Sequence, residues 1–200
     1  LGALIVGFRR AAFSNEAGLG SSAIAHSAVR TREPLTEGFV ALWEPFIDTV
    51  VICTVTALII IVSGQYLQQG LDGVALTSGA FATVFSWFPY VLTVAVFLFA
   101  YSTMITWGYY GTKAVGFLTG ESKLAMNLFK AAFLLMTVVG CSMQLGSIIG
   151  IADAMLLLMS IPNLIGVYLL MPVVRRELDS YLARLKSGEI QSNRAKESAP

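Results

Sequence analysis

Four stretches of the chain are apolar over enough residues to cross a membrane as helices. They are residues 38–62, 88–107, 127–149 and 151–172. A bilayer core is spanned by about 20 apolar residues in a helix, and charged side chains are almost absent from these windows. The pattern therefore predicts an all-α polytopic membrane protein with four transmembrane helices.

The polar segments between these windows divide the chain into three parts. Residues 1–37 are expected to hold the end of a broken helix and a polar cytoplasmic-side loop, because LGALIVG resembles the tail of an apolar helix. Residues 38–172 carry the four spans, with an external loop over 63–87 and a short surface helix near 79–85. The last two windows are nearly contiguous, which predicts a tight hairpin near Gly146–Asp153. Residues 173–200 are expected to form a cytoplasmic amphipathic helix and a disordered tail.

Composition supports a membrane protein and narrows its partners. The 200 residues are 56% hydrophobic and only 12% charged, about half the charge of an ordinary soluble domain. A net charge of +1 favours no nucleic-acid partner, so the expected environment is the lipid bilayer. The two cysteines have no metal-ligand spacing, and no cofactor is expected.

The distribution of lysine and arginine predicts the orientation. Alternating spans place Arg9, Arg10, Arg30 and the tail on one side, whereas residues 63–87 and the last hairpin turn contain no basic residue. If Lys130 snorkels back, all 13 basic residues lie on that side, which the positive-inside rule identifies as the cytoplasm. The prediction is a multi-pass protein of the plasma membrane (a bacterial inner membrane) with a cytoplasmic C-terminus.

One carboxylate lies deep in the first span. Asp48 is ten residues past Gly38, about 15 Å along a helix and near the midplane. Ionisable groups there are costly and mark ion or substrate paths, so Asp48 and the nearby Thr54 are candidates for such a path. The alternative is a hydrogen-bonded carboxyl that fixes helix packing, with Pro45 kinking the helix.

Adjacent hydroxyls in the second span are the candidate sodium ligands. Ser102 and Thr103 lie in FAYSTMITW, a segment without charge, and hydroxyl oxygens suit a hard cation. The alternative is that each hydroxyl bonds a carbonyl of its own helix. Without further information, the sequence favours these bonds within the helix over a sodium site.

The stretch FSNEAGLGSSAIAHS combines capping residues, an acid, glycines and the single histidine. Ser14 or Asn15 is expected to cap the start of a helix, with Glu16 in its first turn. Gly18 and Gly20 allow close approach of another helix or of a ligand. The stretch is too short and polar to cross and return, so it is expected to lie at the inner surface or to dip in part way.

Three separated motifs carry a resemblance to a known family. GFRRAAFSNEAGLGSSAIAHS, then FIDTVVICTVTA, then FAYSTMITWGYYG occur in the order typical of the alanine/glycine:cation symporters (sodium:alanine symporter family). Departures are small: Ala11 replaces a glycine, Ser22 an alanine, and Glu44 with Pro45 stands in a stretch that is generally apolar.

The resemblance implies a carrier of the amino acid–polyamine–cation type, with a LeuT-type inverted-repeat fold. It implies that this chain is the C-terminal fragment, whose partner is the missing N-terminal half of the same carrier. The implied function is secondary active symport of a small neutral amino acid such as alanine or glycine with Na⁺, or alternatively H⁺, by alternating access. Ser102 and Thr103 would bind sodium. Ser14, Asn15, Glu16, Gly18 and Gly20 would form the gate.

Two other classes of function stay open at this level. The first is an ion channel or a non-transporting membrane assembly subunit, which would show no saturable coupling to a substrate. The second is a membrane-embedded hydrolase using His26 with Ser14 or Ser22. No serine–histidine–acid arrangement is readable in the sequence, so we expect that the protein is not an enzyme.

Overall fold

Helices make up the regular structure of the chain. The computed structural model describes residues 2–68, 70–71, 73–143 and 145–190, and among these no strand occurs. In chain order the elements are α1 (Gly2–Asn15), α2 (Ser22–His26), α3 (Pro34–Pro45), the π-helical η1 (Phe46–Ile52), α4 (Cys53–Val62), the 3₁₀ turn η2 (Gln65–Leu67), α5 (Gly73–Ala82), α6 (Phe88–Leu118), α7 (Lys123–Gly140) and α8 (Leu145–Lys186). The all-α prediction is confirmed.

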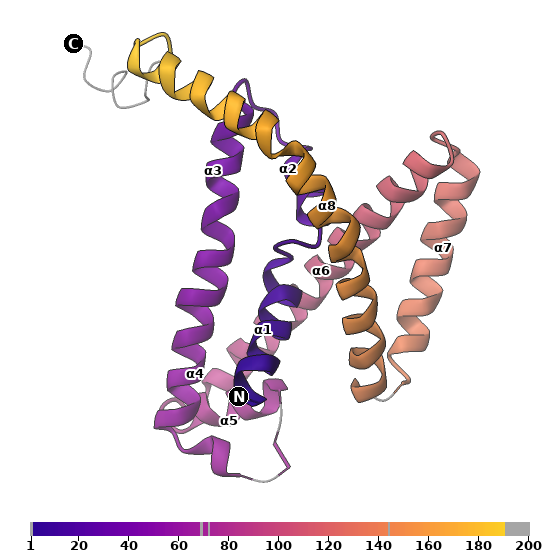
Figure 1. The fold of residues 1–200 in the computed structure, drawn as a ribbon. Coiled ribbons are helices and arrows are strands. Elements are labelled where there is room, and N and C mark those ends of the chain that lie inside the picture. Colours follow the sequence, from indigo (N-terminus) through magenta and orange to yellow (C-terminus); the bar gives the residue numbers. More distant parts are fainter. Residues whose placement is uncertain (1, 69, 72, 144, 191–200) are drawn as a thin grey trace, which may run out of the picture.

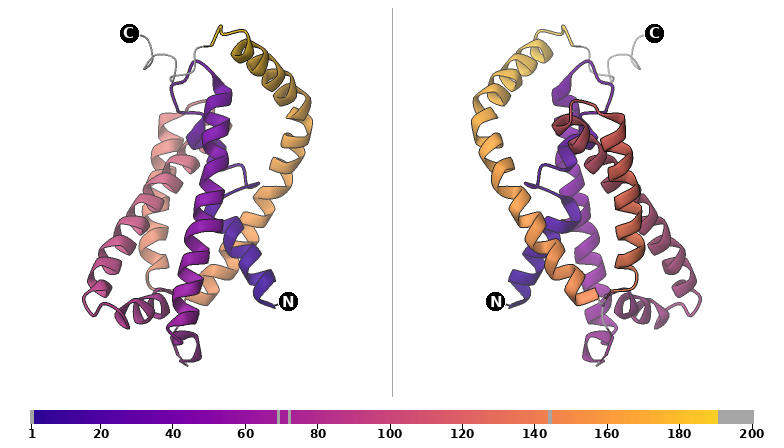
Figure 2. Two further views of the ribbon diagram at one scale, coloured as in Figure 1. Left: turned by 90° about the vertical axis from the view of Figure 1, so that its left-hand side faces the viewer. Right: turned by 90° about the vertical axis from the view of Figure 1, so that its right-hand side faces the viewer.

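Within the described part of the chain, four helical stretches are long and apolar enough to cross a membrane, as the hydrophobic pattern predicts. They are Pro34–Val62, which joins α3, η1 and α4, then Phe88–Leu118, Lys123–Gly140 and Ile148–Lys186. Helix α6 continues past the expected span end at Trp107. Helix α8 runs without interruption through the segment expected to form a separate amphipathic helix, and it bends along its length (Figure 2). Pro162 and Pro172 lie inside it, where each removes one backbone hydrogen bond. The tail expected to be disordered, residues 191–200, lies outside the described residues.

Two local predictions need correction. The hairpin turn expected at Gly146–Asp153 is wrong, because α7 ends at Gly140 and α8 already begins at Leu145. The end of α7 is closed locally: the Ser142 hydroxyl donates to the Val139 carbonyl at 2.7 Å, and the Met143 amide donates to the Gly140 carbonyl. The short helix expected at 79–85 is α5, which begins earlier, at Gly73.

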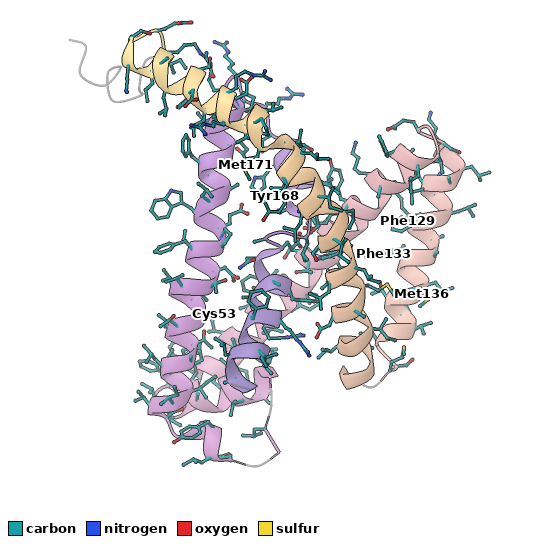
Figure 3. All side chains as sticks on the ribbon, viewed as in Figure 1. Cys53, Phe129, Phe133, Met136, Tyr168 and Met171 are labelled. Atoms are coloured by element: carbon teal, nitrogen blue, oxygen red, sulfur yellow. The ribbon has the colours of Figure 1, made fainter. Side chains whose placement is uncertain are left out.

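The spanning helices alternate in direction. The start of α3, the α6–α7 turn and the end of α8 lie at one end of the molecule, and the end of α4 lies with the start of α8 at the other (Figures 1 and 2). Helix α1 starts at this second end and runs antiparallel to the α3–α4 column. The α6–α7 hairpin is tight because Phe129 packs directly on Gly111, where an added Cβ would meet the ring at 2.1 Å (Figure 3).

Few side chains are buried within the chain itself. Among the described residues, the buried apolar ones are Leu19, Ala80, Tyr110 and Leu156. Leucine, isoleucine, valine and phenylalanine are exposed along every spanning helix. A soluble protein does not present such continuous apolar surface, so these faces suit lipid or further protein. Both cysteines are free and exposed rather than packed.

Candidate functional site

A break in helical structure separates α1 from α2. Helix α1 ends at Asn15, and the backbone then takes left-handed conformations at Glu16 (φ 54°), Gly18 (φ 82°) and Gly20 (φ 87°) before α2 starts at Ser22. The prediction that Ser14 or Asn15 caps the start of a helix is therefore wrong, because a helix ends there. The Asn15 side chain stabilises the turn, its Oδ1 accepting a hydrogen bond from the Ala17 amide at 3.0 Å.

The end of α1 meets the middle of the first span. The Ser14 hydroxyl donates to Asp48 Oδ2 at 2.7 Å, and Asn15 Nδ2 donates to Thr49 Oγ1 at 2.8 Å. Asp48 is the central residue of Pro34–Val62, so about 21 Å of helix lies on either side of it. These contacts join two of the three sequence motifs.

Asp48 and Thr49 belong to a stretch of π-helix. Residues Phe46–Ile52 take the wider π form directly after Pro45, which cannot donate a backbone hydrogen bond. A π-helical turn inside an α-helix leaves backbone groups with poorer internal pairing and occurs frequently at functional sites. The kink predicted at Pro45 is thus realised as a change of helix type, and this change faces the end of α1.

A second set of contacts holds the broken segment against α8. Asn163 Nδ2 donates to the Gly18 carbonyl at 2.9 Å. At Gly20 an added Cβ would lie 2.7 Å from Asn163 Oδ1, so any larger residue would force the Asn163 side chain to move. The Ser21 side chain is almost fully buried and its hydroxyl donates to Glu16 Oε2 at 2.7 Å. We call residues 14–21, together with Asp48, Thr49 and Asn163, the break site.

An ion pair below the break joins α1 to α8. Arg10 donates to both carboxylate oxygens of Asp153, whose side chain is 18% exposed. Asp153 lies in the third turn of α8, far along that helix from its basic C-terminal turns. The placement of all basic residues on one side of the membrane stays a prediction. An arginine whose charge is neutralised by a carboxylate need not remain at the aqueous surface.

A histidine joins α2 to α3 on the other side of the break. His26 Nδ1 lies 2.7 Å from Glu37 Oε1, and Nε2 lies 3.2 Å from Glu44 Oε2. The hydrogen bond to Glu37 raises the pKa of His26 above its ordinary value of 6.5, burial opposes it, and the charge of Glu44 adds to the increase. An open cavity of about 550 Å³ lies beside the ring.

The other predicted site residues lie apart from this cluster. The Ser102 hydroxyl donates to the Phe99 carbonyl of its own helix at 3.0 Å, and the side chains of Ser102 and Thr103 are exposed on α6. Thr54 is exposed on α4. Among the hydrogen bonds of the described residues, none joins these three to the break site. The structure thus brings Ser14, Asn15 and Asp48 together and leaves the hydroxyl pair separate.

Sequence reasoning missed several residues of this arrangement. Thr49 follows Asp48 in the FIDT motif, and Asn163 is a polar side chain directly after a proline inside an apolar span. Both carry a signal that could have been used, because an uncharged polar group in a span also needs a partner. Glu37 and Ser21 gave no such signal. Their roles depend on contacts with His26 and Glu16.

The break site brings together several oxygen-bearing groups. Hydroxyl, amide and carboxylate oxygens converge where the backbone leaves the helix, and a broken helix inside a membrane exposes carbonyls and amides to a ligand. Such groups can bind a small zwitterion or a hard cation by hydrogen bonds and charge.

Comparison with known proteins identifies the family of the chain. The profile of the sodium:alanine symporter family matches residues 1–195. The chain is 36% identical over 197 residues to the sodium/alanine symporter AgcS of Methanococcus maripaludis, covering 97% of this chain and 42% of that protein. It is 38% identical over 188 residues to the probable sodium/glutamine symporter GlnT of Bacillus subtilis, covering 94% and 39%.

A third relative differs in the ions that its name gives. The sodium/proton-dependent alanine carrier protein of Bacillus sp. PS3 is 28% identical over 204 residues, covering 94% of this chain and 46% of that protein. The chain thus spans about two fifths of the length of the curated relatives it matches. No solved structure matches it.

Proposed function

The chain belongs to the sodium:alanine symporter family, and on this premise we propose that it provides the break site of a sodium-coupled amino-acid symporter. The observation that carries the proposal is the polar contact between the interrupted α1–α2 segment and the centre of the first span. An interrupted helix supplies carbonyls, amides and short polar side chains in a region where lipid offers none. A small neutral amino acid such as alanine or glycine matches that set of donors and acceptors.

Transport in this proposal is alternating access. The amino acid binds at the break site and sodium binds at the α6 hydroxyls described below, and each solute binds more tightly to one packing of the helices than to the other. This difference in affinity is what couples the two solutes. Gly18 and Gly20 allow the backbone to change direction at the gate. Asp48 and Thr54 line the path that the ion or the substrate takes.

Ser102 and Thr103 are the proposed sodium ligands on α6. Their hydroxyls are exposed, so they are accessible to an ion held between α6 and another segment. The Ser102 hydroxyl would exchange its bond to Phe99 for the ion, while the helix itself stays intact. The sodium ion is then a transported substrate rather than a resident cofactor. The C-terminal end of α8 is proposed to face the cytoplasm, together with Lys113 and Lys123.

The test uses the whole gene product that carries this sequence, reconstituted in proteoliposomes. A sodium gradient should drive saturable uptake of labelled alanine or glycine. In the double variant Ser102→Ala, Thr103→Ala we expect the sodium concentration for half-maximal uptake to rise by about tenfold, the equivalent of about 1.4 kcal/mol of binding.

Thr93→Ala is the matched control, because the Thr93 hydroxyl also bonds its own helix backbone on α6, at 2.8 Å. This control should keep the sodium dependence of the unmodified protein. Unchanged sodium dependence in the double variant would exclude these two hydroxyls as ligands. Ion flux without saturable amino-acid uptake would instead indicate the channel alternative.

A further inference from the structure

Both ring nitrogens of His26 face carboxylates. Glu37 and Glu44 lie seven residues apart, so they project from neighbouring positions along one face of the same helical column. Their oxygens lie 2.7 and 3.2 Å from Nδ1 and Nε2. The His26 side chain is 20% exposed, and Glu44 is the more exposed of the two acids. The ring therefore links α2 to two acids of the first span that lie about two helical turns apart.

Hydrogen-bond chemistry fixes the number of protons in this cluster. A neutral imidazole has one N–H donor and one bare nitrogen, and an ionised carboxylate can only accept. Two ionised carboxylates at the two nitrogens are satisfied only when both nitrogens carry hydrogen. If the ring were neutral, one carboxyl would have to be protonated. Either arrangement that satisfies both contacts holds one proton more than a neutral histidine with two ionised carboxylates.

We propose that His26, Glu37 and Glu44 form a proton-binding site, whose bound proton holds α2 against α3 and thereby tightens amino-acid binding at the neighbouring break site. Loss of the proton leaves a bare ring nitrogen facing a carboxylate, so one of the two links becomes repulsive. Helix α2 follows the break directly and is only five residues long. Its attachment to α3 therefore influences the position of the broken backbone. The consequence for transport rests on the proposed function, whereas proton binding does not.

The surroundings of the ring provide few competing charges. Helix α3 contributes Glu37 and Glu44. Helix α6, on the other side of α2, contributes Tyr109, Tyr110 and Lys113, with Tyr109 and Lys113 lining a groove against Ala23 and Ser27. The segments flanking α2 contribute Glu16, which is bonded to Ser21, and the exposed Arg30 and Arg32.

Water can reach the site. The cavity of about 550 Å³ next to the ring is lined by His26 and Glu37 together with Ser22, Thr31 and Gly38. It is open and partly polar, so a proton can exchange with solvent without crossing the apolar part of the chain. An isolated structural histidine would not require this access.

The direction of the pH effect follows from the raised pKa of His26. The hydrogen bond to Glu37, which contributes most, raises the pKa of His26 above 6.5 in the folded chain. A group whose pKa is raised on folding contributes its full stabilisation below the unfolded pKa and loses it as pH rises through the folded value. The α2–α3 link is therefore present at acidic pH and is lost on alkalinisation. Amino-acid binding should weaken in the same range.

The first test measures the proton directly. In the whole gene product in nanodiscs, ¹⁵N chemical shifts of histidine side chains are recorded against pH, and the His26 signal is assigned by its loss in His26→Gln. We expect both nitrogens of His26 to be protonated at acidic pH, with a midpoint above pH 6.5 that falls in Glu44→Gln. A neutral ring at pH 6.5 flanked by ionised carboxylates, or a midpoint unaffected by Glu44→Gln, would overturn the proposal.

The second test distinguishes the proton site from a merely structural contact. The amide of Glu44→Gln can donate to Nε2, so a neutral ring then satisfies both links at every pH. The KM for the amino acid should rise about three- to tenfold with pH in the unmodified protein, matching the loss of one hydrogen bond. It should stay low and independent of pH in Glu44→Gln, and it should be high at all pH values in His26→Ala.

Glu177→Gln on α8, far along the chain from the cluster, is the matched control and should keep the unmodified pH profile. A Glu44→Gln variant that retains the full pH dependence of KM would refute the link between the proton and transport. If the unmodified protein takes up no amino acid while the NMR titration behaves as expected, the proposed function fails and the proton site stands.

Discussion

Gly20→Ala is the substitution whose effect on the break site can be calculated most fully. Gly20 has φ +87°, a left-handed conformation that residues with a side chain avoid, and its Cα faces Asn163 of α8. A methyl group there would lie 2.7 Å from Asn163 Oδ1 and 2.9 Å from Cγ, well inside a normal contact of about 3.5 Å. The Asn163 side chain would have to move, and its hydrogen bond to the Gly18 carbonyl would be lost.

The magnitude is the sum of two effects. Placing a non-glycine residue in the left-handed region costs about 1–2 kcal/mol. Loss of the Asn163 hydrogen bond costs about 1 kcal/mol. The native conformation of the break should therefore be destabilised by about 2–3 kcal/mol. If amino acid binds only to that conformation, its apparent dissociation constant rises roughly 30- to 150-fold.

Gly18→Ala is the matched control because it isolates the backbone effect. Gly18 also has a positive φ of +82°, but the nearest atom to an added Cβ is Leu164 Cδ2 at 4.0 Å, an ordinary contact. We expect a loss of about 1–2 kcal/mol and a correspondingly smaller rise in the dissociation constant. Both variants are measured by titration calorimetry with the amino acid on the purified gene product, alongside sodium-driven uptake.

The decisive measurement is the coupling between Gly20 and Asn163. In Asn163→Ala the hydrogen bond is lost but space is gained, so adding Gly20→Ala should cost only the backbone effect. The double variant should therefore bind about as well as Gly20→Ala alone. Strictly additive losses, or equal losses for Gly18→Ala and Gly20→Ala, would refute the contact between the break and α8.

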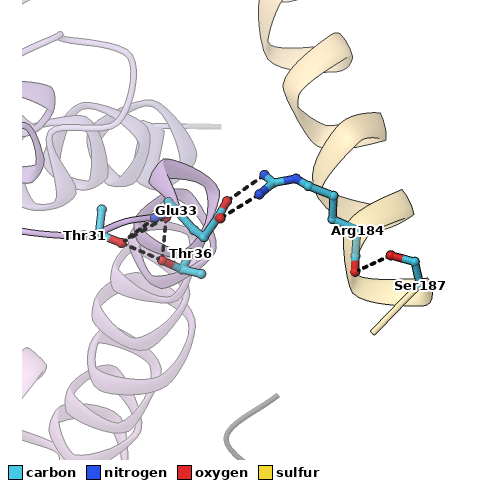
Figure 4. Close-up of polar contacts among 5 residues, drawn as sticks. All are labelled: Thr31, Glu33, Thr36, Arg184 and Ser187. Atoms are coloured by element: carbon cyan, nitrogen blue, oxygen red, sulfur yellow. Dashed lines mark hydrogen bonds and ion pairs between the residues drawn. The ribbon is translucent and has the colours of Figure 1, made fainter. Parts of the chain in front are cut away.

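Three further outcomes follow from the other polar contacts. Arg10→Ala and Asp153→Ala should each lower the stability towards detergent unfolding by about 1–3 kcal/mol, because each leaves a partly buried charge without its partner. Exchanging the two residues should restore part of this loss. No recovery in the exchanged pair would contradict a direct ion pair. Asp48→Asn should weaken the hydrogen bond that residue 48 accepts from Ser14 and reduce uptake about tenfold, corresponding to about 1.4 kcal/mol. Unchanged uptake kinetics would exclude Asp48 from the site. Arg184 forms a bidentate pair with Glu33, with both bonds 2.7 Å (Figure 4), and this pair holds the pKa of Glu33 below its ordinary 4.5. The link is present at neutral pH and should be lost as pH falls through that lowered pKa. The distribution of spin-label distances between α8 and the start of α3 should therefore broaden in acid and, at neutral pH, in Glu33→Gln.

Several features of this protein could be predicted from local sequence. Four windows of about 20 apolar residues predict four membrane-length helices, because an isolated backbone in lipid must satisfy its hydrogen bonds within the same segment. The importance of Asp48 and of the FSNEAGLG stretch followed from the cost of placing charge and helix breakers in an apolar chain. These inferences need only the neighbours along the chain.

Other features depended on contacts between distant residues. A helix was predicted to start at Ser14 or Asn15, because Ser, Asn and Glu are favoured at the start of a helix, but α1 ends there. Here the same side chains end one, and they are held by Asp48 and Thr49, 34 residues later. The position of Arg10 depended on Asp153, 143 residues away, and the pairing of His26 depended on two acids of the next helix.

The physical reason is the range of the forces involved. Hydrophobic length and backbone hydrogen bonding are satisfied within one helix, so the sequence alone determines the spans. A polar or charged group inside the membrane region must find its partner on another helix, and the choice among candidate partners is made only when the helices pack. Tertiary structure therefore decided which acids face His26, that Asn163 packs against Gly18 and Gly20, and where the helix is interrupted.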